Sequence, residues 1–99
     1  MLSDDVKRFE EHSRLYVKNK VAYKVGKLSF ILLYALGYDN LSCRDIESSF
    51  VKVYGVRYRS KVNSYFIGQS MRYYKQFFDR KYVFYNDRKT LLYIKKKKV

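Results

Sequence analysis

The sequence has few of the residues that build metal centres, disulfides and nucleophilic active sites. Its 99 residues include one cysteine, Cys43, and one histidine, His12. A lone cysteine excludes an intrachain disulfide, a cysteine-rich zinc site and a CxxC redox pair, and leaves open only an intermolecular Cys43 disulfide across a dimer. With a single histidine, we expect neither a zinc site nor a Cys–His nucleophile. We expect no metal and no cofactor, and we place His12 on the surface of a helix.

Motifs of the common enzyme classes are also missing. The chain contains no GxxxxGK(S/T) phosphate loop and no GxGxxG turn. The carboxylate pairs Asp4/Asp5 and Glu10/Glu11 have no histidine or cysteine cluster beside them. We therefore predict a protein that is not an enzyme, and we infer no small-molecule effector.

Long apolar runs and proline are absent as well. The longest apolar run, Leu28 to Leu36, is interrupted by Ser29 and is too short to span a bilayer. Residues 1–5 lack the basic and apolar regions of a secretory signal. With no proline-rich linker, the length suits one domain over residues 1–99. We expect an intracellular, cytoplasmic protein with no membrane partner.

Acidic residues become scarce in the second part of the chain. Residues 1–56 carry nine Lys/Arg against seven Asp/Glu, whereas residues 57–99 carry thirteen against two, so that +11 of the net +13 lies there. Charge gathered in one part of a domain indicates a polyanionic partner, most often nucleic acid and less often an anionic membrane surface. A solubilising surface is the alternative, but solubility does not require the charge on one side.

The N-terminal third favours helices. Ser3 followed by Asp4 and Asp5 is typical of an N-cap and predicts a helix over 3–16. Its weak apolar stripe consists of Val6, Phe9, Leu15 and Tyr16. Residues 15–25 fit either a longer helix or two strands paired about Lys18–Lys20. Between these, we favour a helical break followed by a new helix.

Two further helices are expected before residue 60. A stripe with a 3.6 period predicts a buried helix that Gly37 ends in a left-handed cap. The stripe consists of Val25, Leu28, Ile31, Leu32, Ala35 and Leu36. Ser42 and Asp45 then have the spacing of a capping box, which predicts a helix over 42–54 with Gly55 as its stop.

A long segment without proline predicts a helix over 60–78, with Ser60 as N-cap. On a helical wheel its two faces differ in character. The apolar side consists of Phe66, Ile67, Ser70, Met71, Tyr73, Tyr74, Phe77 and Phe78. The polar side consists of Lys61, Ser64, Tyr65, Gly68, Gln69, Arg72 and Lys75, and contains no acidic residue.

The C-terminal residues predict a β-hairpin. Residues 81–85 and 90–94 are rich in aromatic and β-branched side chains, and Asn86–Lys89 separates them as a four-residue turn. The run Lys95–Lys98 continues as a basic tail whose attraction for polyanions would weaken with salt.

This order of elements resembles a winged helix-turn-helix DNA-binding domain, and is similar to small regulators of archaea and of their viruses. The resemblance rests on Ser42–Ile46, the Gly55 turn, Ser60–Val62, Ile67–Gly68 with Met71, and the hairpin Tyr82–Ile94. It covers about residues 25–97. The chain departs from the family pattern because its hairpin turn lacks glycine, and because Phe77–Arg80 stands where many members have a glycine.

The resemblance implies an α+β fold that is mainly helical, with a C-terminal β-hairpin wing. Its parts would be an N-terminal helical extension over 3–24, a helix-turn-helix over 42–78, the wing over 81–95 and a basic tail over 96–99. If the chain is viral, it would act in the host cytoplasm.

The same resemblance implies sequence-specific binding of double-stranded DNA by a transcription regulator. The helix over 60–78 would lie in the major groove, and the wing on the flanking minor groove or its phosphates. The expected recognition-helix contacts are Ser60, Lys61, Ser64, Tyr65, Gly68, Gln69, Arg72 and Lys75. The expected phosphate contacts are Arg44, Arg57 and Arg59, and those of the wing are Arg88 and Lys89.

Each of these residues also has a simpler interpretation. Tyr65 suits the edge of a core, Gly68 a contact with a neighbouring helix, and Ser64 and Gln69 ordinary solvated positions. Arg88 and Lys89 suit an exposed turn, and Arg44 suits an ion pair with Glu47.

We also expect a homodimer, because twofold pairing doubles a short recognition site. The segments 3–16 and 22–36 would form the seam, unless both belong wholly to the monomer core. Two other functions fit the composition: an RNA-binding or genome-coating protein that uses its aromatic residues, and a protein-interaction adaptor on the same scaffold.

Overall fold

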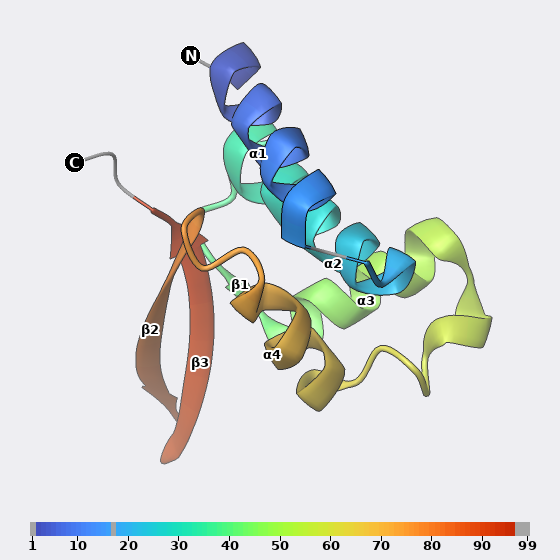
Figure 1. Cartoon of the computed structure of the whole chain (residues 1–99). Coiled ribbons are helices and arrows are strands. Elements are labelled where there is room, and N and C mark those ends of the chain that lie inside the picture. The colour runs from blue at the N-terminus through green and yellow to red at the C-terminus, as the bar shows by residue number, and fades with distance from the viewer. Residues whose placement is uncertain (1, 17, 97–99) are drawn as a thin grey trace.

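The computed structural model describes residues 2–16 and 18–96, and shows an α+β fold (Figure 1). The elements in chain order are α1 (Leu2–Tyr16), α2 (Lys20–Phe30), a π-helical turn η1 (Ile31–Ala35), β1 (Leu41–Ser42), α3 (Cys43–Tyr54), a 3-10 turn η2 (Val56–Tyr58), α4 (Ser64–Arg72), β2 (Phe78–Tyr85) and β3 (Arg88–Lys95). The strands form an antiparallel sheet in the order β1-β3-β2. The prediction of an α+β fold with a C-terminal hairpin is confirmed at this level.

Several predicted helix ends are confirmed by local hydrogen bonds. Ser42 Oγ accepts the Asp45 N–H at 3.1 Å, and Asp45 Oδ2 accepts the Ser42 N–H at 3.0 Å, which completes the capping box before α3. Gly37 and Gly55 have φ angles of 75° and 118°, as expected of glycine stops. The predicted break between the first two helices is confirmed, because Asn19 caps α2 by accepting the Val21 N–H at 2.9 Å.

The apolar stripe predicted for the first helix is wrong, apart from Phe9. Val6, Leu15 and Tyr16 are exposed, and the buried face instead carries Asp5, Phe9 and Ser13 at a spacing of four residues. The Phe9 ring enters the core among other aromatic rings, whereas the positions four residues before and after it on the same face are polar. The predicted N-cap Ser3 lies inside the first turn of α1, and its side chain is outside the described residues.

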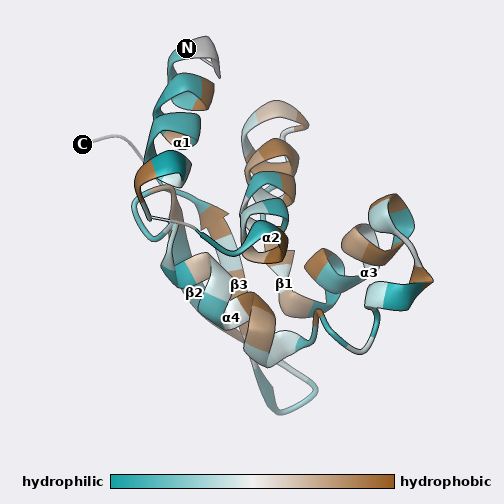
Figure 2. Cartoon of the chain, turned by 45° about the vertical axis from the view of Figure 1, so that its right-hand side comes forward, coloured by the Kyte–Doolittle hydropathy of each residue, from teal (hydrophilic) through white to brown (hydrophobic). Residues whose placement is uncertain are grey.

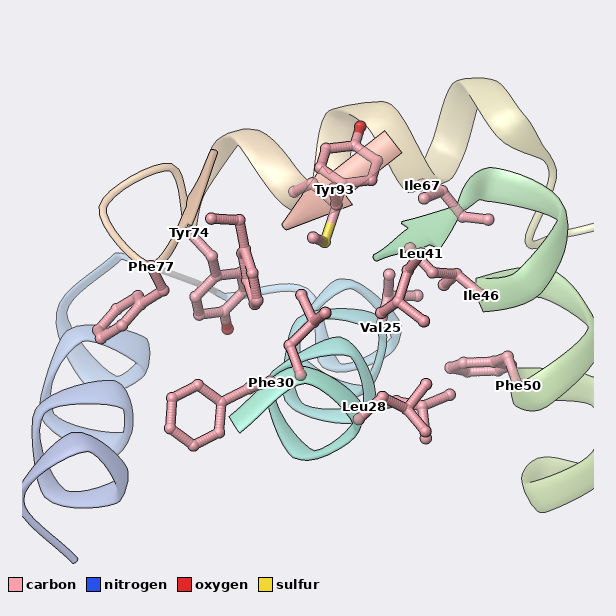
Figure 3. Close-up of a cluster of buried hydrophobic side chains, with 14 of the residues drawn as sticks. Val25, Leu28, Phe30, Leu41, Ile46, Phe50, Ile67, Tyr74, Phe77 and Tyr93 are labelled. Atoms are coloured by element: carbon pink, nitrogen blue, oxygen red, sulfur yellow. The ribbon is translucent and has the colours of Figure 1, made fainter. Parts of the chain in front are cut away.

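The aromatic core joins α1 to the other elements (Figure 3). The Phe9 ring stacks on Tyr74 and lies against Phe30, with ring centroids 4.6 Å away in both cases. The Tyr74 hydroxyl hydrogen-bonds the Ser13 hydroxyl at 3.1 Å. His12, predicted on the surface, is half-buried, and its ring bonds the backbone carbonyl of Tyr73. The N-terminal helix therefore packs on the segment that follows α4.

The predicted helix over 60–78 is wrong at both ends, because α4 spans only Ser64–Arg72. Asn63, not Ser60, is the N-cap, and its Oδ1 accepts the Phe66 N–H at 2.9 Å. The preceding residues form a turn, in which the Val62 N–H donates to the Tyr58 carbonyl at 2.9 Å, and the Val62 side chain is fully buried. After Arg72 the backbone hydrogen bonds join residues three apart, so that the chain forms tight turns instead of an α-helix. Phe78 then pairs with Lys95 in the sheet. Strand pairing thus overrides the helical period of the aromatic residues.

The predicted four-residue hairpin turn is also wrong. The turn has two residues, Asn86 and Asp87, whose φ angles are 46° and 64°. Positive φ at both positions is the type I′ geometry that matches the twist of paired strands, and Asn and Asp tolerate it better than most residues. Arg88 and Lys89 therefore belong to β3, where they pair with Tyr85 and Phe84.

Within residues 2–16 and 18–96, none of the helices is both long and apolar enough to cross a membrane.

Candidate nucleic-acid interface

The exposed side of α4 carries the polar residues that the sequence pattern placed there. Ile67, Ser70 and Met71 are buried against the core. Ser64, Tyr65, Gln69 and Arg72 are exposed on the other side, with Tyr65 75% exposed. Tyr73 was expected on the apolar side, but it is 47% exposed because the helix has already ended at Arg72.

Gly68 lies in the middle of this exposed side and faces open space. A Cβ atom added at Gly68 would meet no atom within 4 Å. The alternative in which Gly68 provides room for a neighbouring helix is therefore wrong. Between the side chains of Tyr65 and Arg72, the backbone of α4 is open to close approach from outside.

The segment before α4 is a turn with four exposed predicted residues: Arg57, Arg59, Ser60 and Lys61. Ser60 and Lys61 lie outside the helix, contrary to the prediction. The Arg57 guanidinium lies 5.0 Å from the centre of the Tyr58 ring and donates to its hydroxyl at 3.4 Å. Tyr58 packs against the core, so that Arg57 is held in place by a fixed ring.

The hairpin has two chemically different faces, because paired residues of antiparallel strands share a face. We define the inner face as Phe78, Arg80, Tyr82 and Phe84 of β2 with Leu91, Tyr93, Lys89 and Lys95 of β3. Its root is buried, since Phe78 and Tyr93 are 4% and 3% exposed. Its outer part is exposed and projects beyond α4 (Figures 1 and 2).

A cavity of about 230 Å³ lies where α4 meets the inner face. It is lined by Gly68, Met71, Arg72, Lys75, Phe78, Arg80 and Tyr93. Three of these are cations, and none is acidic. Burial raises the pKa of the Tyr93 hydroxyl, although Arg80 and Arg72 act in the opposite direction, so this hydroxyl is neutral at physiological pH. The cavity thus combines an apolar floor with a cationic rim, which suits a phosphate group.

The structure brings three predicted residues together around this cavity, namely Gly68, Arg72 and Lys75. Arg80, Tyr82 and Phe84 were missed, and an alternating pattern starting at Phe78 would have placed them beside Phe78 on one face. Arg88 lies on the other face of the hairpin, paired with Tyr85.

The first turn of α3 lies outside the cavity lining. Arg44 is exposed there, and no ion pair joins it to Glu47 in the described part of the chain. Cys43 beside it is half-buried. Burial and the Glu47 carboxylate raise the pKa of the Cys43 thiol, which disfavours the thiolate needed for disulfide chemistry.

The described residues contain no group of three or more His, Cys, Asp or Glu side chains that could hold a metal ion. No family model, curated protein or solved structure was found to match the chain.

Proposed function

We propose that this chain is a winged helix-turn-helix protein that binds double-stranded DNA sequence-specifically and regulates transcription. The observation that carries the proposal is the junction of α4 with the inner face of the hairpin. There an exposed polar helix face meets a cavity rimmed by Arg72, Lys75 and Arg80, with no acidic residue among its lining. In this arrangement α4 would enter the major groove and the hairpin the flanking minor groove, while the cations between them would contact the phosphates that separate the two grooves.

The dimensions of α4 suit the major groove. Its nine residues give a length of about 14 Å. The groove is about 12 Å wide and presents base edges that hydrogen-bonding side chains can distinguish. Ser64, Tyr65 and Gln69 supply such groups on the exposed side. The open space over Gly68 lets the helix backbone approach the duplex closely.

The cations around α4 would position the protein on phosphates. Arg72, Lys75 and Arg80 lie on one side of the helix, and Arg57, Arg59 and Lys61 lie before its N-terminus. Such contacts orient a protein on DNA without reading sequence. They also make affinity fall as salt concentration rises, because each contact releases condensed counterions.

Selection of bound sequences from a random duplex pool tests the proposal. We expect an enriched consensus, and a palindromic one if the protein binds as a homodimer. Binding without any enrichment would leave only general DNA coating. Absence of duplex binding at low salt would contradict the proposal outright.

Two variants then test the assigned surface. Arg72→Ala should reduce the slope of log affinity against log salt by about 1, because one phosphate contact is lost. The matched control is Lys7→Ala, which removes an exposed cation from the side of α1 opposite Phe9. Equal salt slopes for the two variants would exclude the cavity as a phosphate site. Gly68→Ala should weaken binding without lowering stability.

Single-stranded nucleic acid is the second candidate partner, because exposed aromatic rings lie among these cations. Tyr65 and Phe84 are each 75% exposed, and Tyr82 on the inner face is 54% exposed. Aromatic rings beside a basic groove are typical of proteins that stack unpaired bases. Competition between duplex and single strands of the same sequence decides between the partners, and a preference for single strands would overturn the duplex proposal.

The homodimer remains a prediction. Phe9 packs α1 into the core of its own chain, which leaves Leu15 and Tyr16, 75% and 62% exposed, as candidate contacts at its end. Sedimentation velocity with and without the selected duplex measures the oligomeric state directly.

A further inference from the structure

We propose that Phe84 is a wedge that inserts between adjacent base pairs from the minor groove and kinks the duplex. This inference rests on the proposed function, in which α4 occupies the neighbouring major groove. It adds a specific mode of contact, namely apolar insertion near the hairpin turn, to the groove and phosphate contacts described above.

The first argument is the exposure of the Phe84 ring. The ring is 75% exposed, although Phe is among the side chains that most favour burial. Its register partner Lys89 does not cover it, because Lys89 Nζ lies 4.3 Å from the centre of the Tyr82 ring. Within the described residues no aromatic ring or cation is stacked on Phe84. The hairpin therefore holds a bare apolar ring in solvent.

The second argument is the rigidity of its support. Phe84 lies two residues before the type I′ turn, on an eight-residue strand that pairs with its neighbour in continuous register. A tight turn with matched twist fixes the direction in which the strand presents its side chains. A wedge needs this property, because a loosely held ring would lose conformational freedom on insertion.

The third argument is the position of Phe84 relative to charge. Arg80, Tyr82 and Phe84 follow one another on the inner face, and Phe84 lies about 13 Å beyond Arg80 along the strand. Lys89 pairs with Phe84 on the inner face, and Arg88 precedes Lys89 on the opposite face of the same strand. The negative potential of a narrow minor groove attracts both cations. An exposed apolar side chain on an element that also carries cations is the combination that proteins use to unstack a base step and bend a duplex.

Insertion predicts which DNA steps are preferred. Pyrimidine–purine steps such as TA and CA are the easiest to unstack and kink. We therefore expect such a step in the selected consensus, to one side of the bases that α4 contacts.

The test uses the duplex enriched by selection, labelled at both ends for energy transfer and carrying 2-aminopurine at its pyrimidine–purine step. Wild-type protein should shorten the end-to-end distance, corresponding to a bend of roughly 20–90°, and should raise the 2-aminopurine fluorescence. Phe84→Ala should still bind the duplex but lose both signals. Phe84→Leu should keep them, because leucine is also an effective wedge, whereas base stacking requires an aromatic ring.

The matched control is Tyr85→Ala, which removes the neighbouring exposed aromatic ring from the opposite face of the hairpin. This variant should bend the duplex as the wild type does. The inference is overturned if Phe84→Ala still bends the duplex, if Phe84→Leu loses as much as Phe84→Ala, or if Tyr85→Ala is equally impaired. Failure of the proposed function would look different, because the wild-type protein would then enrich no duplex in the preceding selection.

Discussion

Replacing Gly26 by alanine probes the contact that fixes Tyr74 in the core. A Cβ atom at Gly26 would lie 2.2 Å from Tyr74 Cε2, 2.4 Å from Cδ2 and 2.9 Å from Cζ. Carbon atoms in ordinary contact lie about 3.5–4.0 Å apart, so the ring would have to retreat by about 1.3 Å. The ring has no free space to enter, because it is fully buried, stacks on Phe9 at 4.6 Å and bonds Ser13.

Three contributions set the expected magnitude for Gly26→Ala. Overpacking of a filled core costs about 1–3 kcal/mol. Loss of the hydrogen bond between Tyr74 and Ser13 costs about 1 kcal/mol more, while alanine in a helix regains about 1 kcal/mol relative to glycine. We expect a net loss of about 1–3 kcal/mol in the free energy of unfolding, with Tm lowered by at least about 4 °C.

Urea denaturation followed by circular dichroism measures this loss, and two further variants test its cause. Gly68→Ala is the matched control, because an added Cβ there meets nothing within 4 Å, and it should gain up to about 1 kcal/mol. In a Tyr74→Leu background, Gly26→Ala should cost at least about 1 kcal/mol less than in the wild type. If Gly26→Ala is as stable as the wild type, the account of the core is wrong.

Three other changes give equally direct outcomes. Asn63→Ala should lower the free energy of unfolding by about 1 kcal/mol in urea titrations, because α4 loses its N-cap. Asp87→Gly should raise the free energy of unfolding by up to about 1 kcal/mol, and Tm with it, because φ is 64° at this position and glycine adopts positive φ without strain. An unchanged Tm would argue against the type I′ turn. Burial acts to raise the pKa of Glu10, but hydrogen bonds from Lys27 and Tyr23 lower it below its ordinary value. The stability from Glu10 is therefore present above the pKa of an unfolded glutamate and lost as pH falls through the lowered one. Glu10→Gln should then be less stable than the wild type at pH 7, with a smaller difference at pH 3.

Local chemistry was sufficient to predict the elements whose ends depend on nearby residues. The capping box of Ser42 and Asp45 and the stops at Gly37 and Gly55 are decided within a few residues of the chain. The same holds for the exposed side of α4, because a helix with one buried face must present the other to solvent. The sequence alone therefore determined most of the polar surface proposed to bind DNA.

Only the tertiary structure decided where α4 ends and what lies beside it. The residues Tyr73–Phe78 have a helical period, but Phe78 pairs with Lys95, and pairing over that sequence distance leaves no local signal. Ending the helix at Arg72 creates the cavity with Arg80 and lets β2 present Tyr82 and Phe84 on its inner face. The sequence determined which residues are cationic, whereas strand pairing brought Arg80 beside Arg72 and Lys75 and placed the exposed Phe84 ring on the same face of the hairpin.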